Sequence, residues 1–389
     1  MTELDDALFP LTEMGQSVRQ AAAQRSPAFL GERELYSGRP AISVQVGSFE
    51  HLETVGQMCL DTGLGAVLTV DARSVPRNAL PNYVSAFGGA AGTLRDTLVD
   101  ANRYSGTRRR VGVAPLDVGW VDAQLDAGSE FALTDSPYIP AGDIPAVEST
   151  LTQTRKMKRR VIAALPIAIG WLSDAKASRR LRDAATSAGV PVALIVEHRN
   201  DPMGVKAAVR GLLEVLRAEV PVFLLRSDLS AVGAVAHGAA GGAIGTTTAL
   251  RHIFPLPDPG KSGGPGREAS VAAWVPSLLS YISVEKIADI SLDPDAGQYL
   301  RCDCIRCAGL GVERITNEVE AFDHSLRAIS DFAILRLGGG MSPEAQRQAW
   351  HQACQHAQHL YLDIEGTTGV PLTVPRFLGA WWAAHAPGA

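Results

Sequence analysis

Three of the five cysteines in this sequence lie within six residues, at Cys302, Cys304 and Cys307. The other two, Cys59 and Cys354, lie far from this run. A C-x-C-x-x-C pattern in a chain without secretory features is typical of a metal site rather than a disulfide framework. A structural zinc ion takes four nitrogen or sulfur ligands in a tetrahedron. We therefore expect one structural zinc ion here, and free or redox-active thiols are the alternative.

The fourth zinc ligand must come from elsewhere in the chain. His324 is the nearest candidate, and it lies at the start of a predicted helix. His351, His356 and His359 are later alternatives. A structural zinc site holds together a small segment that has little hydrophobic core of its own. We therefore expect the zinc ion to stabilise the fold and to take no part in catalysis.

Acidic residues stand at the ends of three predicted strands, at Asp71, Asp135 and Glu197. In a parallel barrel the carboxyl ends of the strands meet on one face, which carries the active site. These carboxylates are therefore candidate acid/base groups. Arg199 and Arg226 also follow predicted strands and are candidate partners for an anionic substrate group.

Two further stretches are candidate substrate contacts. Ser136 follows Asp135, although an Asp-Ser pair at a strand end can also serve only to cap the next helix. The run Gly241–Thr248, which includes Gly245, can hold an anion through its backbone N–H groups, since phosphate sites favour the last strands of a barrel. Packing of small residues under a helix explains the same glycines equally well.

Basic residues cluster at Arg108–Arg110 and at Arg155–Arg160. Each cluster comes just before a predicted strand, so we expect both near the N-terminal face of the barrel. The simpler interpretation is that these basic side chains are exposed to solvent at the rim of the barrel. The more specific one is that they contact the phosphate backbone of a nucleic acid. The net charge of −5 provides no global basic field, so a nucleic-acid site would be a local patch.

The composition is that of a soluble globular protein. The chain has 389 residues, of which 46% are apolar and 20% charged, and this length can bury a sizeable core. Met1–Gln20 lacks the apolar region of a secretory signal. The longest apolar run, Val161–Leu172, is too short to span a bilayer and contains Pro166. We expect a cytoplasmic protein that does not contact membranes.

Eight short apolar segments alternate with segments of helical length. The predicted strands are Ala41–Val46, Ala66–Val70, Arg110–Ala114, Phe131–Thr134, Val161–Leu165, Val192–Val196, Val222–Leu225 and Gly242–Thr246. They are apolar without alternation, as expected for strands covered on both faces. Eight such units predict an α/β fold, a (β/α)8 TIM barrel. An open doubly wound sheet is the alternative, but the turn after the first strand lacks G-x-G-x-x-G.

We divide the chain into four parts. Residues 1–38 are expected to form an N-terminal helical segment and residues 39–257 the barrel. Residues 258–270 form a Pro/Gly-rich linker, and residues 271–389 a zinc-binding and C-terminal helical subdomain. Ser74–Thr107 is an apparent insertion before the third strand, and its glycines suggest a flexible stretch over the barrel mouth.

The late zinc motif resembles the zinc subdomain of the tRNA-guanine transglycosylases. The matching residues are the Asp293-Pro294 pair, the cysteine run from Cys302 to Cys307 and a histidine carried by the following helix. The segment Phe131–Ser136 (FALTDS) also resembles the strand of that family that ends in Thr-Asp-Ser, whose Asp contacts the base and takes part in proton transfer. Only the zinc motif is specific.

The resemblance implies a TIM barrel with a zinc subdomain inserted late. Members of the family exchange guanine in nucleic acid for a 7-deazaguanine, so an active relative would be a glycosyltransferase (a pentosyltransferase). The implied zinc ligands are Cys302, Cys304, Cys307 and His324. The implied partners are a nucleic acid (tRNA or DNA), a 7-deazaguanine-type base, and a second subunit in a homodimer or a heterodimer.

The sequence departs from the family at two points. Pro137–Pro140 (PYIP) follows the Thr-Asp-Ser, where the family has glycines and Phe-Gln. Gly238–Arg251, which matches the region of the family's nucleophilic Asp, contains no carboxylate. Covalent catalysis needs a group that attacks the sugar carbon. Our first hypothesis is therefore a nucleic-acid- or nucleobase-binding paralogue, or a partner subunit, that lacks this nucleophile.

Two enzymatic hypotheses remain as alternatives. In one, a zinc-containing barrel enzyme acts on a nucleobase or nucleoside, with Asp135, Asp71 and Glu197 as acid/base groups. In the other, Asp228 or Asp71 replaces the missing nucleophile in a true base exchange.

Overall fold

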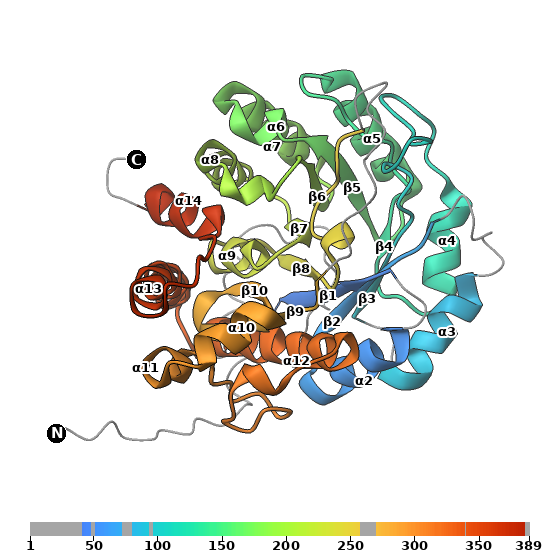
Figure 1. Cartoon of the computed structure of the whole chain (residues 1–389). Helices are drawn as coiled ribbons and strands as arrows, with labels where there is room; N and C mark the ends of the chain where they lie inside the picture. The colour runs from blue at the N-terminus through green and yellow to red at the C-terminus, as the bar shows by residue number, and fades with distance from the viewer. Residues whose placement is uncertain are drawn as a thin grey trace.

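The computed structural model describes residues 41–47, 51–71, 80–92, 96–256, 270–338 and 340–385. Eight parallel strands form a (β/α)8 TIM barrel in the order β3-β2-β1-β8-β7-β6-β5-β4, which confirms the predicted fold class (Figure 1). The strands are β1 (Ile42–Val46), β2 (Gly65–Thr69), β3 (Thr97–Asp100), β4 (Ala132–Leu133), β5 (Val161–Ala168), β6 (Val192–Glu197), β7 (Val222–Ser227) and β8 (Gly241–Gly245). The predicted N-terminal helical segment 1–38 and nearly all of the linker 258–270 lie outside the described residues.

Helices alternate with the strands on the outside of the barrel. They are α2 (Leu52–Thr62), α3 (Leu80–Ala91), α4 (Val118–Asp126), α5 (Ile144–Met157), α6 (Gly170–Ser173), α7 (Ala175–Ala188), α8 (Lys206–Val215) and α9 (Ser230–Ala236). Every residue of β1, β2, β7 and β8 is buried, as expected for strands that helices cover. The side chains of Asp117, Asp143 and Asp174 cap α4, α5 and α7 by accepting backbone N–H groups of the first turn.

The barrel has one seam, between β3 and β4. Within the described residues, a hydrogen-bonded ladder joins every pair of neighbouring strands except these two. Above the seam, Val111 forms an isolated bridge with Tyr138, and Ile139 forms another with Ile167. The segment that follows β3 therefore closes the seam at the carboxyl end of the barrel.

The third strand is not where the sequence predicted it. Arg110–Ala114 is no strand: Val111 and Val113 in it are 50% and 62% exposed. The strand is Thr97–Asp100, whose Leu98 is 1% exposed. The sequence analysis missed it because two apolar residues are too few to stand out within Ser74–Thr107. That stretch is accordingly no insertion, since it contains α3 and β3, and most of its glycines lie in or at the end of α3.

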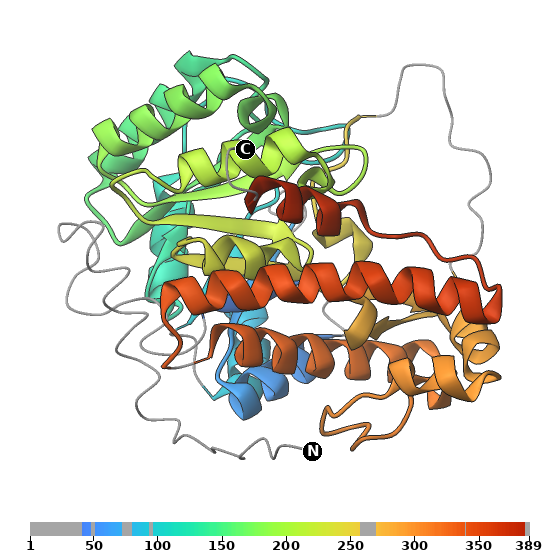
Figure 2. The same ribbon diagram turned by 90° about the vertical axis from the view of Figure 1, so that its left-hand side faces the viewer.

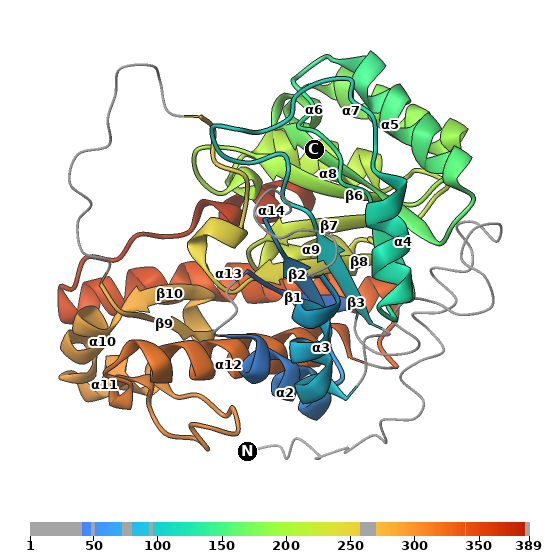
Figure 3. The same ribbon diagram turned by 90° about the vertical axis from the view of Figure 1, so that its right-hand side faces the viewer.

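A C-terminal region follows the barrel. It consists of the hairpin β9 (Ala272–Val275) and β10 (Ser280–Ser283) and of helices α10 (Val284–Ser291), α11 (Pro294–Gly297), α12 (Glu318–Leu337), α13 (Pro343–Thr368) and α14 (Arg376–His385). Only a short 3-10 turn, Thr248–Leu250, directly follows β8. Helix α12 packs against both α2 and α9 and so occupies the position of the eighth barrel helix (Figures 1 and 3). Helices α12 and α13 run side by side across this flank, and α14 packs on α8 (Figure 2).

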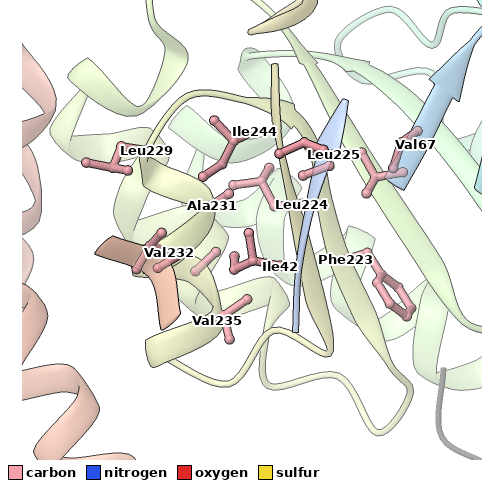
Figure 4. Close-up of a cluster of buried hydrophobic side chains, with 14 of the residues drawn as sticks. Ile42, Val67, Phe223, Leu224, Leu225, Leu229, Ala231, Val232, Val235 and Ile244 are labelled. Atoms are coloured by element: carbon pink, nitrogen blue, oxygen red, sulfur yellow. The ribbon is translucent and has the colours of Figure 1, made fainter. Parts of the chain in front are cut away.

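One hydrophobic cluster extends from the barrel strands to the C-terminal helices. Figure 4 shows part of it, where Ile42, Leu224 and Ile244 of the strands face Ala231 and Val232 of α9. The C-terminal region is therefore packed onto the barrel by the same core that holds the barrel together.

Candidate metal centre, barrel mouth and cleft

The three clustered cysteines and His324 come together in a buried group. Their four potential ligand atoms all lie within 4.8 Å of one another. Nδ1 of His324 is 3.2 Å from Sγ of Cys307 and 3.7 Å from Sγ of Cys304. Around a tetrahedral zinc ion with Zn–S bonds of about 2.3 Å, the ligand atoms stand roughly 3.8 Å apart. The spacing of this Cys3His group is consistent with structural zinc.

The surroundings of His324 also suit a metal ligand. Its Nε2 lies 2.7 Å from the carbonyl oxygen of Trp274 in β9, so Nε2–H donates to that oxygen and Nδ1 is left with a lone pair facing the thiols. The backbone N–H of Trp274 donates to the neighbouring Ser325 at 3.0 Å. The hydrogen bond with Cys302 lowers the pKa of Cys304, while that hydrogen bond and burial raise the pKa of Cys302.

None of the other histidines considered from sequence belongs to this group of four. Nε2 of His351 lies 3.2 Å from Nε2 of His237 on α9, while His356 and His359 are exposed on α13. Arg306 pairs with Asp323 of α12 at 2.8 Å and ties the cysteine loop to the helix that carries His324.

At the barrel mouth, a buried polar network joins the ends of β1, β2, β3 and β7. Oδ2 of Asp100 accepts hydrogen bonds from Gln45 (3.2 Å), Thr69 (3.3 Å) and the hydroxyl of Tyr104 (2.6 Å). Nη1 of Arg226 donates to that hydroxyl at 3.1 Å. Burial raises the pKa of Tyr104, so its hydroxyl stays protonated and donates to the carboxylate.

The predicted carboxylate Asp135 lies in the same mouth but is fully occupied. Its Oδ2 is 3.0 Å from Nη1 of Arg110 and 3.3 Å from Nε of Arg103, and its Oδ1 accepts the backbone N–H of Asp117 at 2.8 Å. Burial raises the pKa of Asp135 although both arginines oppose this effect. Asp135 therefore caps no helix; it anchors the segment after β3 over the mouth.

Glu197, the second predicted carboxylate, is bound in the same way. Arg109 forms a hydrogen-bonded ion pair with its Oε2, and the hydroxyl of Tyr138 donates to its Oε1 at 2.7 Å. The guanidinium of Arg109 also stacks on the ring of Tyr138, 3.9 Å from its centroid. The expectation that Arg108–Arg110 lies at the N-terminal face is wrong, because two of these arginines bind carboxylates at the opposite end of the barrel.

The remaining predicted site residues do not converge on one point. Asp71 follows β2 and is partly buried, whereas Arg199 is exposed beyond β6. Ser136 lies in the core with its Oγ 2.7 Å from Oγ1 of Thr134. Arg226 has φ +50° and binds the carbonyl oxygen of Ala249 at 2.8 Å in addition to the Asp100 network. Its guanidinium is therefore committed to protein groups.

Close packing explains why residue 245 is a glycine. A Cβ atom there would lie 2.3 Å from the carbonyl oxygen of Leu250, so only glycine fits beneath the turn that follows β8. Gly242 in the same strand would meet Ala231 at 2.9 Å. Close packing thus accounts for these two glycines, while the threonines that follow them, Thr246–Thr248, line a cavity.

That cavity is the larger of two that adjoin between the barrel and the C-terminal region. It measures about 1020 Å³ and lies between the β8 turn, the β9–β10 hairpin and α12. A smaller one of about 250 Å³ is lined by Asp201, Asp228 and the start of α14. Arg251 and Tyr281 line both, and the guanidinium of Arg251 lies 3.9 Å from the centroid of the Tyr281 ring. We call the two cavities together the cleft, with a threonine lobe and an acidic lobe.

Sequence reasoning missed Asp100 and Tyr104 and gave Asp201, at the end of the sixth strand, no role. Asp100 directly follows Leu98-Val99, so an apolar pair closed by an acidic residue was the available signal. Asp201 stands four residues beyond Glu197 in a loop, and no local pattern distinguishes it from a turn residue.

Comparison with known proteins identifies no family. No family model and no curated protein matches the sequence. Fifty-nine solved chains match in structure. Among them are a protein described as a fructose-1,6-biphosphate aldolase from Coccidioides immitis (10% identity, 85% of this chain and 96% of that chain, TM-score 0.40), and the 3-dehydroquinate dehydratase from Aquifex aeolicus VF5 (11%, 55% and 93%, TM-score 0.34). A mandelate racemase/muconate lactonizing enzyme from a marine actinobacterium also matches (12%, 59% and 60%, TM-score 0.32). Likeness this remote carries no information about chemistry. None of the described helices is long and apolar enough to cross a membrane.

Proposed function

We propose that this protein is a transglycosylase-like nucleobase- or nucleic-acid-binding subunit whose barrel mouth is closed by ion pairs. The observation that carries the proposal is the pairing of Asp135 with Arg103 and Arg110, and of Glu197 with Arg109. All three arginines come from the segment between β3 and α4, which spans the mouth.

An acid/base group must reach the substrate and exchange a proton with it. Both oxygens of Asp135 already accept hydrogen bonds from protein groups, and so do both oxygens of Glu197. A proton transfer to or from either would first have to displace an arginine from a partly buried ion pair, which costs about 1–2 kcal/mol. This cost favours the binding-subunit hypothesis over an enzyme that uses Asp135.

The cleft supplies a place for a ligand beside the closed mouth. Its threonine lobe presents hydroxyl groups from Thr246–Thr248 and the guanidinium of Arg251, which suit sugar hydroxyls and an anion. The zinc ion in this proposal is structural, one per chain, and holds the cysteine loop against α12 beside the cleft. A 7-deazaguanine-type base, tRNA or DNA, and a related subunit in a homodimer or a heterodimer are the proposed partners.

Binding and exchange assays test this proposal together. Zinc-loaded protein is titrated with 7-deazaguanine-type bases and with tRNA and duplex DNA, and radiolabelled guanine incorporation is measured in parallel. We expect binding of a base or of a nucleic acid without incorporation. Incorporation by the purified chain would show that it is an active transglycosylase, and the absence of any binding would overturn the proposal.

Affinity purification from the native cell tests the partner. Light scattering on the purified chain gives the oligomeric state, and we expect a homodimer or co-purification of a related subunit. A protein that stays monomeric and brings down neither a subunit nor a nucleic acid would contradict this part of the proposal.

A further inference from the structure

A further cavity lies beside the metal centre and is distinct from the cleft. It measures about 500 Å³ and lies between the cysteine loop, the turn that joins β9 and β10, and helices α12 and α13. We call it the arginine cavity, because Arg301 and Arg336 line it. At about 30 Å³ for each water molecule its volume equals roughly seventeen waters, which is room enough for a small organic ligand.

Arg336 of α12 brings a partly buried positive charge to this cavity. Its Nε is buried and donates no hydrogen bond within the described residues. Burial lowers the pKa of Arg336, and no ion pair in the described part of the chain compensates for the lost hydration. The guanidinium carbon lies 5.4 Å from the centroid of the Phe332 ring on the same helix. A cation that leaves water without a counter-ion is destabilising, and a bound anion would remove that cost.

Arg301 brings a second guanidinium to the same cavity. Its backbone forms a bridge with Gly311 across the cysteine loop, so Arg301 has a fixed position at the start of that loop. Its side chain is exposed and forms no ion pair with any residue that the structure describes. Two arginines from different elements therefore line one cavity without a carboxylate partner among the described residues.

The acidic residues of the cavity limit the anion that it can take. Asp303 and Asp331 line it, but both are exposed to solvent, and within the described structure neither pairs with Arg301 or Arg336. Water therefore screens their charges, whereas Nε of Arg336 is buried. His356 of α13, which is also exposed, is a further ionisable residue in the wall. Two positive and two negative side chains favour a singly charged ligand over a dianion.

Apolar side chains form much of the remaining wall. They include Phe332 and Leu335 of α12 and Leu279 of the β9–β10 turn. Leu335 is 69% exposed, so a ligand packed against it would remove apolar surface from water. A ligand that fits this cavity therefore joins an apolar body to one anionic group.

We propose that the arginine cavity binds a small organic monocarboxylate with an aromatic or aliphatic body. The carboxylate accepts hydrogen bonds from the guanidinium groups of Arg336 and Arg301, and the body packs on Phe332 and Leu335. A guanidinium can donate two parallel hydrogen bonds to a carboxylate, which favours this group over other single negative charges. The cavity is distinct from the barrel mouth and from the cleft, so this inference does not depend on the proposed function.

Calorimetric titration of the zinc-loaded full chain at pH 7 tests the site with phenylacetate, phenylacetamide and inorganic phosphate. Phenylacetamide is the matched neutral probe, because it has the shape of phenylacetate without its charge. Phosphate tests whether the site takes an anion that has no apolar body. We expect phenylacetate to bind at least about tenfold more tightly than phenylacetamide or phosphate, since hydrogen bonds between charged groups contribute that much.

Arg336→Met and Arg301→Met should each weaken the binding of phenylacetate by about tenfold or more and leave the binding of phenylacetamide unchanged. Methionine keeps an unbranched apolar stem, so each substitution removes mainly the charge and the hydrogen-bond donors. Arg217→Met is the control, since the Arg217 side chain is 74% exposed, pairs with Glu214 and does not line the cavity. This control should bind phenylacetate as the wild type does.

Thermal denaturation gives a readout that needs no measured affinity. Arg336→Met removes a charge without a counter-ion, so without ligand it should melt at the temperature of the wild type or higher. Phenylacetate should raise the melting temperature of the wild type and not that of this variant. A variant that melts well below the wild type would show that the protein already compensates the charge of Arg336, and this would overturn the inference.

Three results of the titration would also overturn it. They are equal affinity for phenylacetate and phenylacetamide, unchanged affinity for phenylacetate in both arginine variants, and no binding of phenylacetate at millimolar concentration. If phosphate binds as tightly as phenylacetate, the cavity does not select a carboxylate with an apolar body, and the proposed ligand class is wrong.

Discussion

Nη1 of Arg110 lies 3.0 Å from Oδ2 of Asp135, and this contact spans the seam of the barrel. Arg110 belongs to the segment that follows β3 above the mouth, and Asp135 follows β4, the strand to which β3 is not hydrogen-bonded. The ion pair therefore joins the two strands that the sheet itself leaves apart, and Arg103 strengthens the junction from the same segment.

Arg110→Met tests how much this junction stabilises the fold. We expect the free energy of unfolding at pH 7 to fall by about 1–2 kcal/mol, less than for a fully buried pair because the arginine is 29% exposed and Arg103 remains. The loss should be smaller near pH 4, because burial raises the pKa of the Asp135 carboxyl in the folded protein and a protonated carboxyl no longer pairs with the arginine. Urea denaturation at both pH values measures it.

Arg159→Met is the control for that experiment. It breaks the surface pair with Asp122, in which the two side chains are 50% and 41% exposed, and it should change stability by less than about 1 kcal/mol. If both variants lose the same free energy of unfolding, the ion pair at the mouth stabilises the fold no more than an exposed pair does.

Metal removal should affect stability through the Cys3His group alone. We expect about one zinc ion per chain. Cys304→Ser and His324→Ala should each lose the metal and lower the melting temperature, because the ligands hold the cysteine loop to α12. Cys354→Ser, at a buried cysteine of α13, should keep the metal. Elemental analysis and calorimetry supply both measurements, and metal retained in His324→Ala would exclude this histidine as a ligand.

Gly245→Ala distinguishes packing from anion binding in the β8 turn. The new Cβ would lie 2.3 Å from the oxygen of Leu250, so we expect a loss of about 1–3 kcal/mol in the absence of any ligand. Gly366→Ala is the matched control, since a Cβ there, in the last turn of α13, meets nothing within 4 Å and should stabilise the protein by up to about 0.5–1 kcal/mol. Denaturation of both variants without phosphate present measures these effects.

Asp201→Asn should change the pH dependence of stability with a definite sign. Because the folded pKa of Asp201 is raised, the unfolded chain releases its proton first as pH increases, and wild-type stability falls from about pH 4 until the folded pKa is passed. The fall is about 1.4 kcal/mol for each pH unit between the two pKa values. The amide cannot ionise, so the variant should gain stability relative to the wild type as the pH rises above about 4.

Thermal denaturation across that pH range measures the difference for Asp201→Asn. Asp183→Asn, at an exposed carboxylate, should show no such trend. A flat difference in both variants would mean that Asp201 ionises in the folded protein as it does in the unfolded chain.

The sequence predicted the features that follow from the pattern of neighbouring residues, namely most of the strands and the metal centre. Seven of the eight strands are long or apolar enough to be recognised in this way, and the buried Cys3His group follows from cysteine spacing and one nearby histidine. The strand Thr97–Asp100 was not recognised because it has only two apolar residues. Its neighbour β4 has only two residues, but it was recognised because it lies within the apolar segment Phe131–Thr134. The pairing of Arg109 with Glu197 joins residues 88 positions apart, and no local pattern reports such a contact.

Helix α12 serves two sites at once. It carries His324 at the metal centre, and its Phe322, Ser325 and Ile329 line the cleft. A ligand and a metal ion that both require the same placement of one helix are thermodynamically linked, and each must tighten the other's affinity by the same factor. Zinc availability would then set the ligand affinity of the cleft, and an apparent dissociation constant has meaning only at a stated metal occupancy.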